Sequence, residues 1–362
     1  MVPDFAKVHN KFKLNREHFT HTQLKEVAYS FVKEGEPYES VLGDFLLDWL
    51  DDKDYVIVKT SGSTGLPKII KLQKQAMVNS AIATGDCFNL EPGFTALHCL
   101  PVYFIAGKMM LVRAIILGLE LDIVEPSSNP LQDVFKKYDF CAMLPMQLQN
   151  SLDKLHKIKT VIIGGASVSK QLQEKIQDIS TKVYATYGMT ETITHIAVKQ
   201  LNVVSSLRGE TTKQSVEDYY QTLPNITISQ DERDCLVIDA PKLNDEIIVT
   251  NDIVKLYSET EFEVLGRYDN MINSGGIKLF PEQIETKLKP KMNQRFFIAS
   301  EKDETLGEKL ILVLEGESNN LETEVFEGLD TYEIPKQVYA VTQFKETSTG
   351  KIKRFETLKL LK

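Results

Sequence analysis

The loop from Thr60 to Lys68 is the part of this chain whose residue types best suit chemistry. It reads Thr60-Ser61-Gly62-Ser63-Thr64-Gly65-Leu66-Pro67-Lys68 and follows Tyr55-Val56-Ile57-Val58, an apolar run that predicts a buried strand. Glycines allow close backbone approach, hydroxyl and N–H groups donate hydrogen bonds, and Lys68 supplies a cation, so the loop suits a polyphosphate. It lacks the Gly-Lys-Ser/Thr ending of a Walker A loop. A surface turn rich in serine and glycine is the alternative interpretation.

A second polar cluster, from Tyr187 to Thr192, could complete such a site. Within Tyr187-Gly188-Met189-Thr190-Glu191-Thr192, Glu191 can bind Mg²⁺, a hard ion that prefers oxygen ligands and usually shares them with phosphate. Thr190 can donate to a phosphate oxygen, and Tyr187 offers a flat face to a base. The alternative is a helix N-terminus, with Thr190 as the capping residue and Glu191 favoured by the helix dipole.

The elements that must position these clusters predict an α/β sheet. Helical periodicity covers 22–33, 41–50 and 74–88, and a further helix would present Leu172, Ile176 and Ile179 on one face. Short apolar runs at 160–163 and 182–186 end in two glycine turns, Gly164-Gly165-Ala166 and Tyr187-Gly188. Ligands in such folds collect beyond the carboxyl ends of the strands, so both turns and the first loop could meet at one site.

The second half of the chain changes character. Short alternating runs between 203 and 264 predict strands of a smaller sheet, and 266–270 is a polar break. Beyond the break, a helix opens at Pro281 with Ile284 and Leu288 in register, and 309–314 predicts another strand. We therefore expect a domain boundary near Asp269.

Composition indicates an ordinary soluble protein of about two domains. The chain has 362 residues and a formal net charge of -9, which argues against a nucleic-acid surface and favours a cytoplasmic enzyme. Its four cysteines are scattered without a CxxC pair, so neither a disulfide framework nor a zinc site is indicated. The most apolar region, 100–124, contains four charged residues, which argues against a transmembrane span.

Six motifs in a fixed order give the chain its resemblance to a known family. They are Thr60–Lys68, Tyr187–Thr192, Thr250-Asn251-Asp252, Gly266-Arg267-Tyr268-Asp269, Ser274-Gly275-Gly276-Ile277-Lys278 and Thr347-Ser348-Thr349-Gly350-Lys351-Ile352. With these motifs, the chain resembles the adenylate-forming superfamily of acyl-CoA synthetases, peptide-synthetase adenylation domains and luciferases from Tyr55 to its end.

The resemblance implies a fold and a set of roles. It implies a large N-terminal adenylating domain (1–268) with mixed sheets and flanking helices, and a small mobile α+β C-terminal lid domain (269–362). It implies an ATP site of Thr60, Ser61, Gly62, Ser63, Thr64, Gly65, Lys68, Thr186, Tyr187, Gly188, Asp252 and Arg267. It further implies catalytic Lys351, Thr190 and Glu191, with Glu191 also holding Mg²⁺. Asp269 would be the hinge, and Ser274, Gly275 and Gly276 would line the path of coenzyme A.

The chemistry of carboxylate activation agrees with these roles. A carboxylate oxygen must attack the α-phosphate of ATP, so cations such as Lys351 and Mg²⁺ must offset the repulsion between two anions. No general base is needed, because a carboxylate is already ionised near pH 7. A solvated lysine near a basic terminus is the alternative interpretation of Lys351 taken alone.

The acid is less clearly specified. The phosphate loop begins already at Thr60, which predicts a reduced N-terminal region. The sequences of segments 100–107, 143–149 and 163–166 are similar to those of o-succinylbenzoate–CoA ligases of menaquinone biosynthesis. That resemblance implies an acyl pocket that includes Phe104, Lys108, Gly164, Gly165 and Ala166. Phe104 and Ala106 stand where those ligases often have His and Ser. An aromatic substrate with a second carboxylate needs a cation, and we expect Lys108 to provide it, or else to extend to solvent.

Other functions stay open at this point. The chain could be a different aryl- or acyl-CoA ligase, an adenylation enzyme that loads a carrier protein, or a nucleotide-binding relative without turnover. We expect ATP, Mg²⁺, coenzyme A and an aromatic carboxylic acid as ligands, no nucleic acid and no membrane span; a homodimer stays open as one assembly.

Overall fold

The structure is a computed structural model that describes residues 3–59, 69–177, 179–203, 218–317, 323–346 and 352–361. The predicted residues Thr60, Ser61, Gly62, Ser63, Thr64, Gly65, Lys68 and Lys351 lie outside these ranges. The described chain divides into two compact units. Residues up to 227, together with 239–248, form the first unit; residues 228–238 and those from 249 onward form the second.

The first unit is built on a mixed sheet. Its strands occur in the order β11-β10-β9-β8-β7-β5-β6-β1-β2. They are β1 (Lys13–Leu14), β2 (Glu17–His18), β5 (Thr95–His98), β6 (Glu120–Ile123), β7 (Tyr138–Met143), β8 (Ile158–Ile163), β9 (Lys182–Gly188), β10 (His195–Gln200) and β11 (Tyr220–Thr222). Strands β5 to β9 run parallel, and β10 pairs with β9 antiparallel. Strand β5 has β6 on one side and β7 on the other, so the strand order reverses there, which is where α/β sheets commonly bind ligands.

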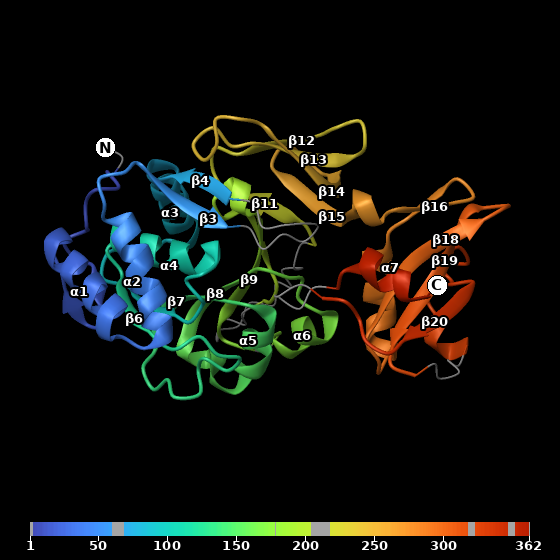
Figure 1. Ribbon diagram of the computed structural model, residues 1–362, viewed down its shortest axis with the longest axis horizontal. Helices are drawn as coiled ribbons and strands as arrows, with labels where there is room; N and C mark the ends of the chain where they lie inside the picture. The colour runs from blue at the N-terminus through green and yellow to red at the C-terminus, as the bar shows by residue number, and fades with distance from the viewer. Residues whose placement is uncertain are drawn as a thin grey trace, which may run out of the picture. The chain divides into compact units, whose positions relative to one another are not determined.

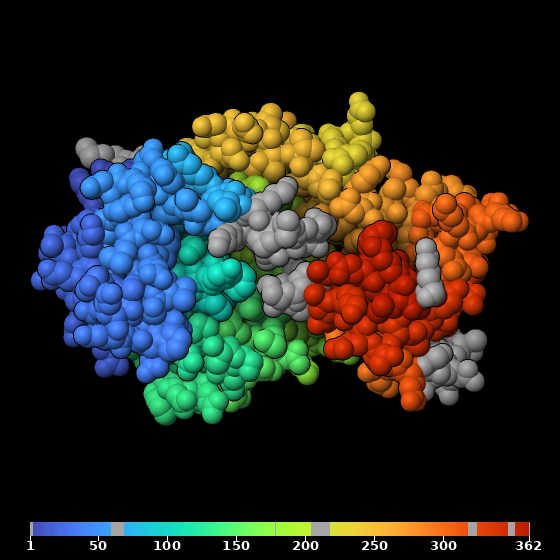
Figure 2. All heavy atoms as spheres, viewed as in Figure 1, coloured from blue at the N-terminus to red at the C-terminus, as the bar shows by residue number. Residues whose placement is uncertain are grey.

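Helices cover this sheet (Figure 1). They are α1 (His21–Glu34), α2 (Pro37–Trp49), α3 (Lys74–Phe88), α4 (Ile105–Leu117), α5 (Pro145–Asn150) and α6 (Lys170–Lys175). Helix α1 begins with a capping box between Thr20 and Gln23, and α4 ends where Gly118 adopts a φ of 72°. The first two helices pack together and present the blue surface in Figure 2.

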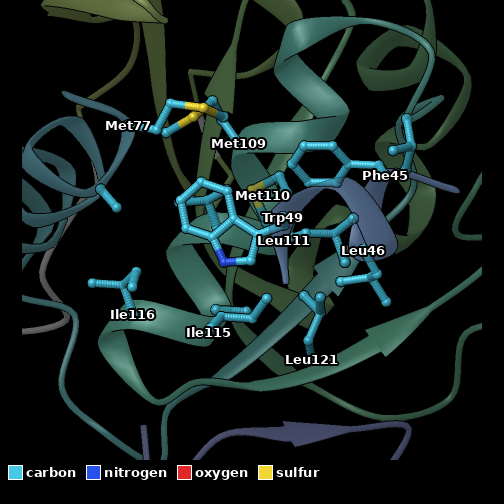
Figure 3. Packing of buried hydrophobic residues seen from close by; sticks show 14 of the residues in the cluster. Phe45, Leu46, Trp49, Met77, Met109, Met110, Leu111, Ile115, Ile116 and Leu121 are labelled. Carbon is cyan, nitrogen blue, oxygen red and sulfur yellow. The ribbon is translucent and has the colours of Figure 1, made fainter. Parts of the chain in front are cut away.

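The core of the first unit explains the composition of α4. Nine of its residues are buried, so it is apolar on nearly every side. Trp49, the single tryptophan, is 1% exposed in this core. Figure 3 shows it among side chains from α2, α3, α4 and β6, including Phe45, Met77, Met110, Ile115 and Leu121.

One expectation about burial is wrong. The apolar run at 55–58 is a strand, as predicted, within β3 (Tyr55–Lys59), but it is not buried on both faces because Ile57 is 56% exposed. Strand β3 pairs with β4 (Ile69–Gln73) in a separate two-stranded sheet that leaves one face to solvent.

The second unit contains two further groups of strands. The first is β12 (Thr227–Gln230), β13 (Cys235–Asp239), β14 (Ile248–Leu256) and β15 (Glu261–Arg267), in that order. Strands were predicted here correctly, but they do not form a separate smaller sheet. The second is a sheet ordered β17-β16-β19-β18, with β20 beside β19. Its strands are β16 (Ile272–Ser274), β17 (Ile277–Leu279), β18 (Phe296–Asp303), β19 (Gly307–Glu315) and β20 (Gln337–Val341).

Both faces of this last sheet are buried. Alternate residues of β18 and β19 belong to two different apolar clusters. One cluster includes Ile284 and Leu288 of α7 (Pro281–Leu288), and the other packs against Leu358 of α8 (Arg354–Leu358). The result is an α+β layer, as predicted. The division into two units places β14 and β15 in the second unit, whereas the predicted domain boundary at 268/269 follows these strands. That residues 269–362 move as a lid remains a prediction.

Candidate active site

The carboxyl ends of β8 and β9 bring two of the predicted glycine turns together. Thr186 donates a hydrogen bond from Oγ1 to the carbonyl of Ile163 at 3.0 Å. A Cβ atom on Gly164 would lie 2.8 Å from that same Oγ1, so the first turn needs a residue without a side chain. Gly165 and Ala166 are exposed beyond it. The two turns therefore lie side by side beyond the carboxyl ends of β8 and β9, as expected, whereas the first loop, 60–68, lies outside the described residues.

The turn after β9 is tightly constrained. Gly188 pairs with His195 across the turn, and a Cβ atom on Gly188 would lie 2.2 Å from the carbonyl oxygen of Thr194. Between them, Ile193 adopts φ 66° and ψ -56°, and Thr194 donates its N–H to the Thr192 carbonyl at 2.7 Å. This is a γ-turn with positive φ, a strained conformation that is rare for a β-branched residue. Such backbone strain at a predicted site indicates that the turn serves to direct Thr194 and His195, the residues that follow it.

Thr190 and Glu191 lie in a single 3₁₀ turn (Thr190–Thr192) preceded by Met189, so Thr190 does not cap a helix. Glu191 is exposed, and its backbone carbonyl accepts a hydrogen bond from Asn244 at 3.4 Å. Tyr187 lies near Tyr220, with 5.9 Å between ring centroids. Among the described residues, no group of three or more His, Cys, Asp or Glu could hold a metal by itself. One carboxylate beside a hydroxyl still suits Mg²⁺ that shares its other ligands with phosphate.

Arg113 is a buried cation that the motif analysis did not assign. It lies on α4 with 1% exposure. Its guanidinium donates to the hydroxyls of Thr84, at 3.2 Å, and Thr194, at 3.1 Å, and lies 3.5 Å from Nδ1 of His195. No described carboxylate pairs with it. Burial lowers the pKa of Arg113 to about 9, which still leaves it charged at pH 7. The sequence signal that could have identified Arg113 was a single charged residue within an otherwise apolar helical segment.

His195 connects Arg113 to a recess. Burial, and then the charge of Arg113, hold the pKa of His195 well below its ordinary value, so the imidazole is neutral near pH 7. Its Nε2 is buried without a hydrogen-bond partner among the described residues. His195 also lines a recess of about 230 Å³ that includes Asn79 and Asp86 of α3. This volume accommodates a small organic group; Arg113 does not itself line the recess but lies behind His195, which does.

The predicted acyl residues on α4 lie elsewhere. Phe104 is the residue before the helix, and its ring is 5.3 Å from that of Tyr103. The ammonium of Lys108 lies 4.8 Å from the ring centroid of Phe45 on α2. Burial lowers the pKa of Lys108, while Asp48 and Asp44 of α2 oppose that shift. Neither Phe104 nor Lys108 lines the recess beside His195. The ammonium of Lys108 therefore points at α2, and its role as a carboxylate ligand remains a prediction.

Two predicted nucleotide residues meet in the second unit. Asp252 on β14 is the register partner of Arg267 on β15, and their side chains form an ion pair at 3.2 Å. Arg267 also reaches the carboxylate of Asp269 at 3.4 Å. An aspartate fixed by an arginine on adjacent strands presents oxygen acceptors in a defined direction, as binding of two ribose hydroxyls requires.

The predicted coenzyme A residues form the turn between β16 and β17. Gly275 and Gly276 have φ values of 60° and 86°, which L residues rarely adopt. Turn geometry is therefore sufficient to explain both glycines, and a role for Ser274, Gly275 and Gly276 in coenzyme A binding remains a prediction.

The fold is that of an α/β protein with glycine turns at the carboxyl ends of two adjacent parallel strands. The sequence model described as AMP-binding enzyme matches residues 9–231. The chain belongs to the family of AMP-binding enzymes. No helix among the described residues is long and apolar enough to cross a membrane.

Three relatives illustrate how far the similarity extends. An acyl-CoA synthetase (AMP-forming)/AMP-acid ligase II-like protein from Dyadobacter fermentans is 36% identical, with 93% of this chain and 98% of that one covered and a TM-score of 0.61. The 2-succinylbenzoate–CoA ligase of Staphylococcus epidermidis is 26% identical over 323 residues, 82% of this chain and 68% of that protein. O-succinylbenzoate coenzyme A synthetase from Bacillus subtilis, solved with ATP and magnesium, has a TM-score of 0.73 at 17% identity over 94% of this chain and 82% of that one. The last of these likenesses concerns the fold alone.

Proposed function

We propose that this protein is an AMP-forming acid–CoA ligase and that its acid is 2-succinylbenzoate, the precursor that o-succinylbenzoate–CoA ligases activate in menaquinone biosynthesis. Membership of the AMP-binding enzyme family and the name of the staphylococcal relative support the reaction. The observation that carries the choice of acid is Arg113, a buried guanidinium that no described carboxylate neutralises. An acid with a second carboxylate would supply the missing anion.

The reaction has two steps. A carboxylate oxygen of the acid attacks the α-phosphorus of ATP, and pyrophosphate leaves. The thiol of coenzyme A then loses its proton and attacks the acyl carbon, and AMP leaves. Lys351 would offset the charge of the two anions in the first step, and Glu191 would hold Mg²⁺, whose role is to neutralise phosphate charge. Asp252, fixed by Arg267, would accept from the ribose hydroxyls.

The surroundings of Arg113 suit a carboxylate. Two hydroxyls and a neutral imidazole share its donors without neutralising it, so the guanidinium keeps its full charge. Hydrogen bonds between guanidinium and carboxylate are stronger than neutral ones. His195 also lines the recess, and its buried Nε2 has no hydrogen-bond partner among the described residues, so it can make a further polar contact after a small rearrangement. We therefore assign recognition of the second carboxylate to Arg113 in preference to Lys108.

A second candidate has its own support. The Dyadobacter relative is the more similar in sequence, at 36% identity, and its description names no particular acid. A ligase for a different aryl or acyl acid would keep the same first step and fill the recess differently. Acid-dependent ATP–pyrophosphate exchange, described next, separates the two candidates.

Acid-dependent ATP–pyrophosphate exchange tests the proposal. We expect exchange with 2-succinylbenzoate well above benzoate, succinate and fatty acids, followed by release of AMP when coenzyme A is added. Exchange confined to fatty acids would refute 2-succinylbenzoate and retain the ligase. Folded protein that exchanges with no acid would favour a nucleotide-binding relative without turnover. Cytoplasmic location and a homodimer are further proposals, and sedimentation of the purified protein tests the second.

A further inference from the structure

The turn between β12 and β13 holds an arginine in a fixed orientation. The carboxylate of Asp231 accepts the backbone N–H groups of Arg233, at 2.8 Å, and of Cys235, at 2.9 Å. The same carboxylate binds the Arg233 side chain, at 2.8 Å from Nε and 2.7 Å from Nη2. Both the backbone and the guanidinium of Arg233 are therefore attached to Asp231, which leaves the planar guanidinium few orientations.

Arg233 contacts two successive residues of β14. Nη2 donates to the carbonyl of Thr250 at 3.2 Å, and Nη1 donates to Oδ1 of Asn251 at 2.9 Å. Thr250 is 6% exposed, and its hydroxyl accepts the backbone N–H of Asp252 at 3.1 Å. Arg233 is thus bonded to the two residues that directly precede Asp252, the aspartate that we expect to bind ribose.

Asn251 also connects Arg233 with the ion pair of Asp252. Its Nδ2 donates to Oδ2 of Asp269 at 3.3 Å, and that oxygen accepts from Nη2 of Arg267 at 3.4 Å. Arg267 meets Asp252 through Nη1 at 3.2 Å. The guanidinium of Arg267 is therefore shared between two carboxylates, and Asn251 restrains the one that is not expected to bind ribose.

Arg267 is a weak restraint on Asp252 by itself. The Asp252 side chain is 13% exposed, whereas those of Arg267 and Asp269 are 43% and 49% exposed. Exposed ion pairs contribute little, because water competes for both charges and long side chains lose rotamer freedom. Arg233 adds a second restraint that is better anchored, since its own turn holds it and its guanidinium lies 5.1 Å from the ring centroid of Tyr268.

We propose that Arg233 is a positioning residue for the nucleotide: it fixes the direction of the Asp252 carboxylate, so that this carboxylate recognises the ribose hydroxyls. It acts through the Thr250 carbonyl and the Asn251 side chain. The inference rests on the proposed function, in which Asp252 accepts from those hydroxyls. A carboxylate that accepts two hydrogen bonds at once needs a defined orientation, and the residues that support it provide that orientation.

Binding of AMP and of 2′,3′-dideoxy-AMP, which lacks both ribose hydroxyls, tests this inference. Isothermal titration should show that the wild-type protein prefers AMP. In Arg233→Met we expect the preference to fall about tenfold, because the ribose loses the equivalent of about one hydrogen bond to a charged group. Affinity for 2′,3′-dideoxy-AMP should stay within about threefold of wild type. Lys255→Met is the matched control, since it removes a β14 cation that lies 4.8 Å from the Tyr257 ring, and it should leave both affinities unchanged.

Two further variants show whether Arg233 acts through Asp252. Asn251→Ala removes one of the two connections and should lower the preference for AMP less than Arg233→Met does; it also tests the inference if Arg233→Met does not fold. Asp252→Asn should lower the preference by itself. Adding Arg233→Met to Asp252→Asn should then have no further effect, because both residues act on the same hydroxyls.

The ratio of the two affinities separates positioning from a general structural role. Equal weakening of both nucleotides in Arg233→Met would overturn the inference, as would a wild-type protein that binds both nucleotides equally. A wild-type protein that prefers AMP but supports no acid-dependent pyrophosphate exchange would refute the proposed ligase function. Loss of that preference in Arg233→Met would still assign the positioning role.

Discussion

At the scale of single residues, two cations on α4 have opposite surroundings. Lys108 lies against the Phe45 ring with Asp44 and Asp48 nearby, whereas Arg113 is buried beside hydroxyls and a neutral imidazole. A charge near carboxylates is already compensated, and a charge without them is available to an incoming anion. The helix therefore offers one structural cation and one that suits a ligand.

Arg113→Met should weaken binding of 2-succinylbenzoate about 10- to 100-fold, since a hydrogen bond to a charged group contributes about 1.5–3 kcal/mol. Affinity for benzoate, which lacks the second carboxylate, should change little. Isothermal titration of both acids measures this difference. Lys108→Met is the control from the same helix and should alter either affinity less than about threefold. The reverse ranking of the two variants would restore Lys108 as the carboxylate ligand.

Gly188→Ala tests the turn that directs Thr194 and His195. The new methyl would lie 2.2 Å from the Thr194 carbonyl oxygen, so the backbone must shift. We expect a loss of about 1–3 kcal/mol of stability and loss of acid binding together. Gly85→Ala is a suitable comparison because its methyl would meet the flexible end of Leu117 at 2.9 Å and leave acid binding intact. Urea unfolding with acid titration checks both, and a fully active Gly188→Ala protein would show that the turn geometry is dispensable.

At the scale of elements, hydrophobic periodicity predicted the positions of helices, because local sequence controls where a helix forms. Helix α3 spans Lys74–Phe88, as the pattern indicated. Helix α2 starts at Pro37, before the predicted Val41, because Pro37 fits a first helical turn and Glu36 and Glu39 cap it. The predicted helix after β8 ends at Lys175, before two of its three expected apolar residues, Ile176 and Ile179. Pairing between distant segments, such as β10 beside β9, leaves no such local pattern and could not be predicted.

A buried ion pair joins the loop after α2 to the start of α3. Lys74 is fully buried and meets Asp51 at 2.8 Å. Asp51→Ala would leave the buried ammonium without its carboxylate partner but with the Asp51 backbone carbonyl at 2.9 Å, and we expect a cost of about 2–3 kcal/mol, reduced from the usual value also because the Asp51 side chain is 26% exposed. Lys53→Met, which removes the exposed cation bound to the same carboxylate, should have no measurable effect.

The same pair has a defined pH dependence. Burial raises the pKa of Asp51, but hydrogen bonds from Lys74 and Lys53 outweigh it, and the net pKa is lowered. A carboxyl whose folded pKa is depressed stabilises the protein above its unfolded pKa of about 4 and loses that contribution as the pH falls further. The stability difference between wild type and Asp51→Ala should therefore be constant from about pH 7 to 5 and shrink below about pH 4. Denaturant unfolding over this range measures it, and a difference that vanishes already at pH 6 would contradict the ion pair.

At the scale of the whole molecule, the order of motifs along the chain was sufficient to predict the family, whereas the cation that we propose for the second carboxylate could be found only in the structure. Glu191 and Asp252 could be assigned because each lies in a recognisable motif. Arg113 could not be assigned a role from sequence, because it lies in no such motif. It indicates an anion site only once its burial, and the absence of a carboxylate partner among the described residues, are known. Contacts that depend on several distant segments are the part of a site that sequence leaves open.

Two units with separate apolar clusters should not unfold as one. The single tryptophan, Trp49, belongs to the first unit and reports on it alone, whereas circular dichroism reports on both. We expect the two signals to give different urea transitions without ligand. Leu312→Ala, at a fully buried position of β19, should destabilise its unit by about 2–5 kcal/mol and shift only the circular dichroism transition. Leu111→Ala in α4 should shift the fluorescence transition instead. Coincident transitions that move together in both variants would mean that the units unfold cooperatively.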